Sequence, residues 1–357
     1  DMKEAVPPWQ ILHMTLFEVT LPELKNSQDR EYQLADLIGM MEQLFRGLRT
    51  ISAKDSSQHV ALEIAVADNS DDIVFYAAVP TSFVTLFEKQ TLSLFPHAVL
   101  TEQVHDYNIF VDGGDSIISE LSLKKHPIYP LRTHEAFSSD PLAVLLNAFS
   151  KIERDGGGAA VQFLFRHPKH SYRGTYEEIV KRVKKGMKPG EAIRRSTLTG
   201  EMMAGVGELF FSSAKPKDDM PPEPDQEALE LFAEKQKGDF FETNIRIAVS
   251  ARDQHRAKDI LREIEATFGQ YAHLTGNQFT FQHRTGSSLR LAEKAFSFRE
   301  FNSKTAMPLS ETELSTIIHF PGNGIVSSPQ FKQSHAATAA APTDMPTEGT
   351  LLGINRH

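Results

Sequence analysis

Apolar and polar positions in the first third of the chain alternate, or recur at helical spacing, in an order that predicts a small α+β unit. Strand patterns occupy residues 11–21, 60–66, 73–79 and 98–104. Between the first two, residues 29–49 carry apolar side chains every three or four positions, which is typical of one face of a helix. A second helix is predicted after Pro80 and ends at Pro96. The predicted order is therefore strand–helix–strand–strand–helix–strand.

That order is the ferredoxin-like split βαβ arrangement, in which two helices cover one face of a four-stranded antiparallel sheet. The second half repeats it in part. Strands are predicted at 159–166, 241–249 and 277–284, with helices at 175–187 and 257–271. This half is one strand short, and residues 208–212 are a candidate for the strand that is lacking. We therefore predict an α+β fold of two ferredoxin-like antiparallel-sheet domains joined by a helical spacer.

Stretches rich in glycine, proline or charge, together with helix-capping residues, suggest where the predicted domains begin and end. We assign the first domain to 1–125, an extended segment with the spacer helix to 126–158, the second domain to 159–325 and a linker to 326–357. Residues 188–225 are rich in glycine, proline and charge, so they are predicted to be a flexible insertion in the second domain. Two capping boxes, Thr175 with Glu178 and Ser310 with Glu313, predict helix starts.

The composition excludes several classes of protein and site, but it does not identify a function. The chain has 357 residues, 40% hydrophobic and 24% charged, which is ordinary for folded domains. It has no cysteine, which excludes disulfides, thiolate metal sites and cysteine nucleophiles. No apolar run approaches the roughly 18 residues of a membrane span. Because the chain opens on Asp1 and not on methionine, we expect it to be part of a longer product.

Charge is unevenly distributed along the chain. Residues 1–150 carry 10 Lys+Arg and 21 Asp+Glu, whereas the net charge of the whole chain is only -9. The first half is therefore a poor match for nucleic acid, since phosphate binding needs a positive face. The second half contains one concentrated basic segment, made of Lys181, Arg182, Lys184, Lys185, Lys188, Arg194 and Arg195.

This basic segment has three interpretations. It is a solvated helix face, with or without a contact to the acidic first half of a neighbouring copy; it follows a nucleic-acid backbone; or it contacts anionic lipid. Aromatic residues, which single-strand binding uses, are represented nearby by only Tyr172 and Tyr176.

The sequence lacks the common motifs of catalytic sites. The sequence has no Walker A loop, no G-x-S-x-G elbow and no H-E-x-x-H pair. His167 and His170 are too few for a zinc site, and the acids at Asp68, Asp71 and Asp72 lack the spacing of a calcium loop. We therefore predict no catalytic residue, no metal, no cofactor and no small-molecule ligand for this segment.

Five segments together resemble one family. They are LHMTLFEVTLP (12–22), the stretch 120–152, FFETNIRIAVSA (240–251), LSETELSTIIHFP (309–321) and LLGINRH (351–357). They look like the N-terminal non-motor region of type IV secretion or conjugation-type ATPases, the coupling-protein-like DNA translocases, in the versions found in ultrasmall bacteria. In that family a Leu-Gly-x-Asn strand, matched here by Leu352, Gly353 and Asn355, leads into the ATPase core.

The resemblance implies a non-catalytic assembly and docking module for a motor that moves DNA or protein. ATP and magnesium would then belong only to a motor domain beyond residue 357, and hexamer formation would occur through that domain. Partners would include other copies and secretion-channel proteins, on the cytoplasmic side at the inner face of the cell membrane. The alternative is a nucleic-acid-binding protein with tandem ferredoxin-like domains that uses the basic helix at 181–195.

Overall fold

A computed structural model describes residues 13–21, 33–54, 58–152, 156–202 and 223–321. The strands are β1 (Met14–Thr20), β2 (Val60–Val66), β3 (Val74–Pro80), β4 (Val99–Gln103), β5 (Asp115–Leu123), β6 (Gly158–Arg166), β7 (Phe240–Ala251), β8 (Phe279–Arg284) and β9 (Met307–Ser310). The α-helices are α1 (Leu34–Lys54), α2 (Val84–Leu94), α3 (Leu142–Phe149), α4 (Tyr172–Lys184), α5 (Pro189–Met202), α6 (Gln226–Lys235), α7 (Gln254–Thr267), α8 (Ser287–Ser297) and α9 (Glu311–Ile317). The mixed α+β class is confirmed.

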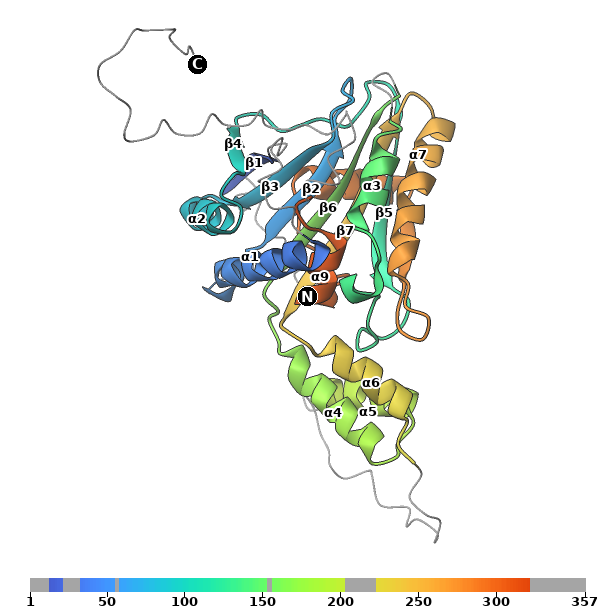
Figure 1. Cartoon of the computed structure of the whole chain (residues 1–357). Coiled ribbons are helices and arrows are strands. Elements are labelled where there is room, and N and C mark those ends of the chain that lie inside the picture. Colours follow the sequence, from blue (N-terminus) through green and yellow to red (C-terminus); the bar gives the residue numbers. More distant parts are fainter. Residues whose placement is uncertain (1–12, 22–32, 55–57, 153–155, 203–222, 322–357) are drawn as a thin grey trace, which may run out of the picture.

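One continuous antiparallel sheet runs through both halves of the chain (Figure 1). Its strand order is β4-β1-β3-β2-β6-β7-β5-β8, and β9 pairs with β7 beside this path. The halves meet where β2 pairs with β6, from Val60 opposite Phe165 to Val66 opposite Ala159. Two separate sheets were expected, but this pairing joins them, because it satisfies the backbone groups of two strands that would otherwise be sheet edges.

The sequence did not predict β5. It lies between β7 and β8 in the sheet, although it precedes the predicted boundary at residue 125. Its adjacent Ile117 and Ile118 are both buried, on opposite faces, so the simple alternation expected of a half-buried strand is lost. The predicted candidate at 208–212 lies outside the described residues.

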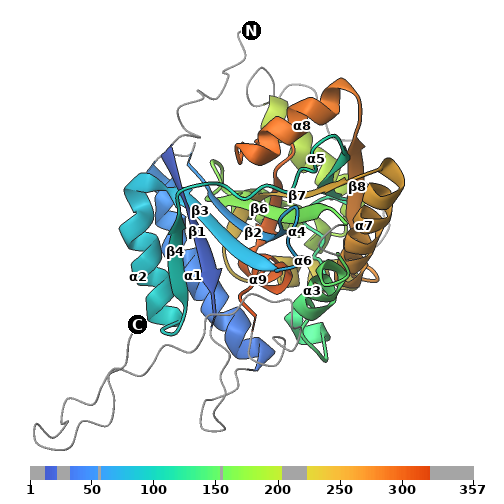
Figure 2. The same cartoon turned by 90° about the horizontal axis from the view of Figure 1, so that it is seen from above.

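Helices cover both faces of the sheet (Figure 2). On one face, α1, α2, α3, α7 and α9 share the main core with inward residues such as Phe163 on β6 and Ile247 on β7. On the other face, α8 contributes Ala292 and Phe296 to a smaller cluster with Ala160 and Ala248. The predicted spacer helix is α3, which packs against α7 and contributes to the main core.

The connection between β6 and β7 carries three helices, α4, α5 and α6, which project from the sheet (Figure 1). We call α4–α6 the helical lobe. The prediction of a flexible insertion was wrong for residues 189–202, which form α5. Ala192 is buried in the core of the lobe with Ile179 and Val183 of α4, and this packing holds the segment helical despite Gly190. Residues 203–222 and the predicted linker at 326–357 lie outside the described residues.

Candidate functional site

The helical lobe has its own apolar core. Tyr176, Ile179 and Val183 of α4 pack with Leu231 and Phe232 of α6. The lobe is also attached to the body through apolar contacts: Tyr176 meets Phe240 at the start of β7, with ring centroids 5.3 Å apart. This core orients the helices and directs their polar faces outward.

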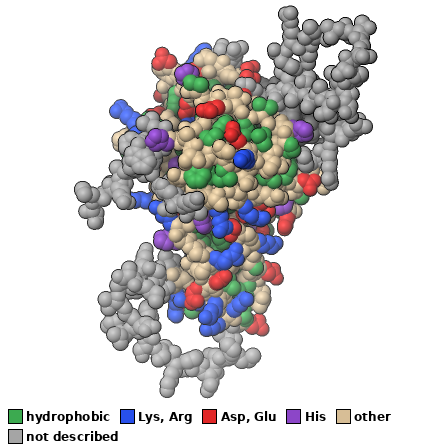
Figure 3. Space-filling model, turned by 90° about the vertical axis from the view of Figure 1, so that its left-hand side faces the viewer, with side chains coloured by type: hydrophobic (Ala, Val, Ile, Leu, Met, Phe, Trp, Pro, Cys, Tyr) green, Lys and Arg blue, Asp and Glu red, His purple; other side chains and the backbone are tan. Residues whose placement is uncertain are grey.

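The structure brings the seven predicted basic residues together on this lobe. They lie on α4 (Lys181, Arg182, Lys184), at its end (Lys185), just before α5 (Lys188) and on α5 (Arg194, Arg195). Figure 3 shows Lys and Arg side chains on the surface of the helical lobe, which is the lower part of the molecule in that view. Arg182 is half-buried, and the other six are exposed.

Only part of this positive charge is neutralised within the lobe. Arg182 pairs with Glu178 at 3.0 Å, and Arg195 pairs with Glu191 at 2.7 Å. For Lys181, Lys184, Lys185, Lys188 and Arg194, we find no carboxylate partner among the described residues. We call these five the lobe cations. The cations in the last turn of α4 also suit the negative end of the helix dipole, so their presence there has a structural reason as well.

A second arrangement, which the sequence did not predict, lies on the sheet face that carries α8. One row of directly opposed residues crosses eight strands, and most of its members are polar. The row is Thr101, Glu18, Tyr76, Glu63, Gln162, Arg246, Glu120 and Gln282. Its central members are buried, with Glu63 at 0% exposure and Arg246 at 2%.

Hydrogen bonds connect the middle of this row to the segment after α8. Glu63 accepts from Arg299 Nε and Nη2, both at 2.9 Å, and from Gln162 Nε2 at 2.7 Å. Arg299 also donates to Asp106. Burial alone would lower the pKa of Arg299, but Glu63 and Asp106 raise it above its ordinary value. A buried charge is tolerated only when it is paired in this way.

Arg246 continues the network toward the edge of the sheet. It donates to Gln162 Oε1 at 3.1 Å and to the carbonyl oxygens of Ala295 at 3.2 Å and Glu300 at 2.6 Å. Burial lowers its pKa to about 10, while Glu120 acts in the opposite direction. The arginine therefore ties α8 and the following loop to β7.

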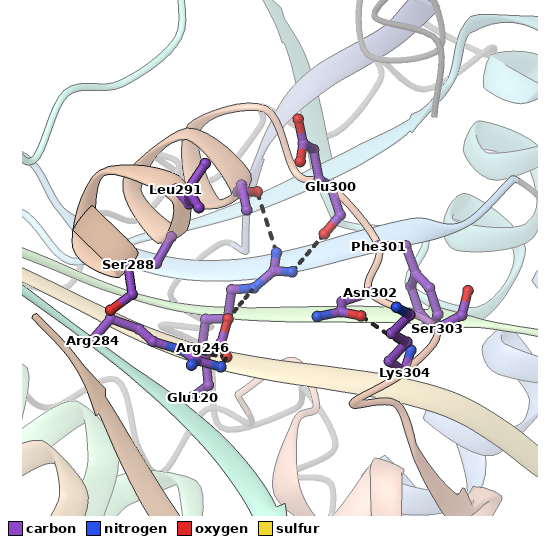
Figure 4. A pocket seen from close by; sticks show the side chains of 12 residues that line it. Glu120, Arg246, Arg284, Ser288, Leu291, Glu300, Phe301, Asn302, Ser303 and Lys304 are labelled. Atoms are coloured by element: carbon purple, nitrogen blue, oxygen red, sulfur yellow. Dashed lines mark hydrogen bonds and ion pairs between the residues drawn. The ribbon is translucent and has the colours of Figure 1, made fainter. Parts of the chain in front are cut away.

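Beside Arg246 is a pocket of about 430 Å³ (Figure 4). Its floor is formed by Glu120, Arg246 and Arg284 on β5, β7 and β8, and its walls by α8 and residues 300–304. The sequence did carry a signal for a covered face here: Ala61, Ala65, Ala160 and Ala248 are small residues where a solvent-facing strand would be polar. Within the residues described, we find no cluster of three or more His, Asp or Glu side chains that could hold a metal ion.

This geometry defines the class of protein: an α+β protein built on one large antiparallel sheet, with a projecting helical lobe and a pocket that has charged and apolar walls. The chain belongs to the family described as Domain of unknown function (DUF8128), whose sequence profile matches residues 19–333. A search of curated proteins finds no match.

Among solved structures, the chain is similar to one described as a novel heme-binding protein from Thermus thermophilus. The identity is 9%, and the match covers 78% of this chain and 94% of that chain. The TM-score is 0.18, so this similarity carries no argument about fold or ligand. Across the described helices, none combines the length and the apolar character that crossing a bilayer requires.

Proposed function

We propose that this chain is an assembly and docking module made of two ferredoxin-like units fused edge to edge. Two observations support the fold: β4-β1-β3-β2 and β8-β5-β7-β6 have equivalent strand orders, and all neighbouring strands are antiparallel. In this reading β2 and β6 are equivalent second strands that pair with each other. The helical lobe is then an insertion in the hairpin of the second unit, a position where an insertion leaves the sheet intact.

The lobe cations carry the docking proposal. Five exposed positive side chains without a carboxylate partner in the described part of the chain lie on α4, on α5 and in the turn between them. Such a surface favours association with an anionic partner, whose long-range attraction raises the rate of encounter. We assign the partner to a protein surface, in other copies of the same protein or in a secretion channel.

The wider setting that we propose is a type IV secretion or conjugation-type ATPase at the inner face of the membrane, which moves DNA or protein. Support comes from the five sequence segments that resemble that family. If the gene continues past His357, we expect a Walker A loop and ATP hydrolysis that needs magnesium in the continuation. A continuation without a Walker A loop would remove this setting and leave the docking proposal to be tested separately.

The docking proposal is tested in cells with a photo-crosslinking residue. Placed at Lys185 on the lobe, it should give protein adducts, identified by mass spectrometry as another copy or a channel component. The matched control is the same residue at Arg290, an exposed position on α8. If the Lys185 adducts do not exceed those at Arg290, the lobe is not the docking surface.

DNA is the alternative partner, and the same lobe cations favour it, since phosphates are bound by exposed Lys and Arg. In that case the Lys185 crosslinker would yield nucleic-acid adducts in place of protein adducts.

A further inference from the structure

The pocket between α8 and residues 300–304 is separate from the helical lobe, and its chemistry is distinct. Its volume of about 430 Å³ lies in the range of roughly 300–1,000 Å³ that small-ligand pockets occupy. Arg246, at 2% exposure, forms part of its floor, and its guanidinium is held in place by two backbone carbonyls (Figure 4).

Both carboxylates of the pocket lining have a cation nearby, and Glu120 is hydrogen-bonded to one. Glu120 accepts from Arg284 Nε at 2.9 Å and from Arg284 Nη2, and its other oxygen is 3.8 Å from Arg246 Nε. The carboxylate of Glu300 lies 4.0 Å from Lys294 Nζ on α8. The pocket lining therefore holds three cations, Arg246, Arg284 and Lys304, against the two carboxylates, which leaves it with one net positive charge.

The unengaged polar groups around the pocket are mostly hydrogen-bond donors. Among the described residues, Lys304 Nζ and Arg284 Nη1 have no acceptor. Ser303 accepts from Arg166 through Oγ, which leaves its hydroxyl hydrogen available. A ligand that satisfies these groups must supply several acceptor oxygens, and a net positive site favours an anionic one.

The opposite wall of the pocket is apolar. Leu291, Ala292 and Ala295 of α8 line it, together with Phe301. Leu291 is 70% exposed, so it has apolar surface that a ligand would cover. We propose that this pocket binds a small organic carboxylate or phosphate that also carries an apolar group, with the anion at Arg284 and Lys304 and the apolar part against α8.

Ligand-observed NMR titration of the full chain tests this, with phenyl phosphate and benzoate as probes and benzyl alcohol as the neutral analogue. The anions should bind at least about tenfold more tightly than the alcohol. Arg284→Gln and Lys304→Gln should each weaken anion binding several-fold. Lys304 is exposed, so its substitution should leave the fold intact even if the loss of Arg284 does not.

Two matched controls lower the charge by the same amount elsewhere: Arg290→Gln on α8, outside the pocket lining, and Lys184→Gln on the lobe. Neither should change the affinity. The proposal is overturned if wild-type protein binds neither anion at millimolar concentration, or if Lys304→Gln and Arg284→Gln bind as wild type does. It is also overturned if Lys184→Gln weakens binding as much as they do, because the anions would then be on the lobe.

Discussion

Lys235 on α6 and Glu313 on α9 form a fully buried ion pair, with 2.5 Å between Lys235 Nζ and Glu313 Oε2. Lys235 Nζ also donates to the carbonyl oxygen of Pro308. Glu313 accepts from the backbone N–H groups of Leu131 and Ser310, both at 2.8 Å. One carboxylate thus connects the helical lobe, the extended segment before α3 and the start of α9.

Replacing Lys235 by methionine should therefore destabilise the protein strongly. Glu313 would remain buried without its counter-charge, and removing one partner of a buried pair costs about 3–5 kcal/mol. The free energy of unfolding from urea denaturation measures this loss.

The double variant Lys235→Met/Glu313→Gln is the control, because it removes both charges and should recover part of the loss. The assignment fails if Lys235→Met costs less than about 1 kcal/mol, the value typical of an exposed pair.

The two predicted capping boxes lead to a comparative prediction. At Ser310 the box is confirmed: its side chain accepts from Glu313 N–H, and the Glu313 side chain accepts from Ser310 N–H. The prediction of a capping box at Thr175 was wrong, because α4 begins at Tyr172 after Ser171 and Thr175 lies inside the helix.

Ser310→Ala should therefore lower the free energy of unfolding by about 1 kcal/mol. Thr175→Ala should be neutral or slightly stabilising, and equal effects in thermal unfolding would contradict this reading.

These two boxes illustrate what the sequence could and could not predict. Local signals placed most strands and helices to within a few residues, because alternation along a strand and three-to-four spacing along a helix depend only on residues that are close in sequence. The pairing of β2 with β6 is non-local, and neither Val60 nor Phe165 specifies which strand of the other half its own strand pairs with. The buried Glu63 and Arg246 occupy polar positions of alternating strands and therefore look solvent-facing until α8 is placed above them.

The candidate sites divide in the same way. The lobe cations are close in sequence, so their grouping was predictable, and only the helical form of residues 189–202 was not. The pocket gathers Glu120, Arg246, Arg284 and the loop at 300–304, which are separated by many residues. Only the sheet order brings them together.

The partly buried side chain of His126 should make the stability of the protein depend on pH. Burial, and secondarily the charge of Lys235, lower its pKa in the folded state. Its Nδ1 accepts from Ile128 N–H at 3.3 Å, which requires the unprotonated nitrogen. As the pH falls below about 6.5, the unfolded chain takes up a proton that the folded chain does not. The free energy of unfolding should then fall by up to about 1.4 kcal/mol per pH unit, until the lowered pKa is reached.

His126→Asn should flatten this dependence, which urea denaturation between pH 7.5 and 5.5 measures. His105→Asn, at an exposed histidine, is the control. An unchanged slope in His126→Asn would show that other groups cause the loss of stability in acid.

The DNA alternative makes a prediction about salt. If the lobe cations contact phosphates, the variant Lys184→Glu/Lys185→Glu should bind duplex DNA more weakly than wild type. Two fewer phosphate contacts should also reduce the slope of log affinity against log salt by about 2, because each contact releases about 0.9 of a counterion. Fluorescence anisotropy over a salt series measures both quantities.

The matched variant Arg290→Glu/Lys294→Glu makes the same charge change on α8 and should retain the wild-type slope. If wild-type protein binds no DNA even at low salt, the nucleic-acid alternative is lost, and docking to a protein partner remains as the function of the lobe.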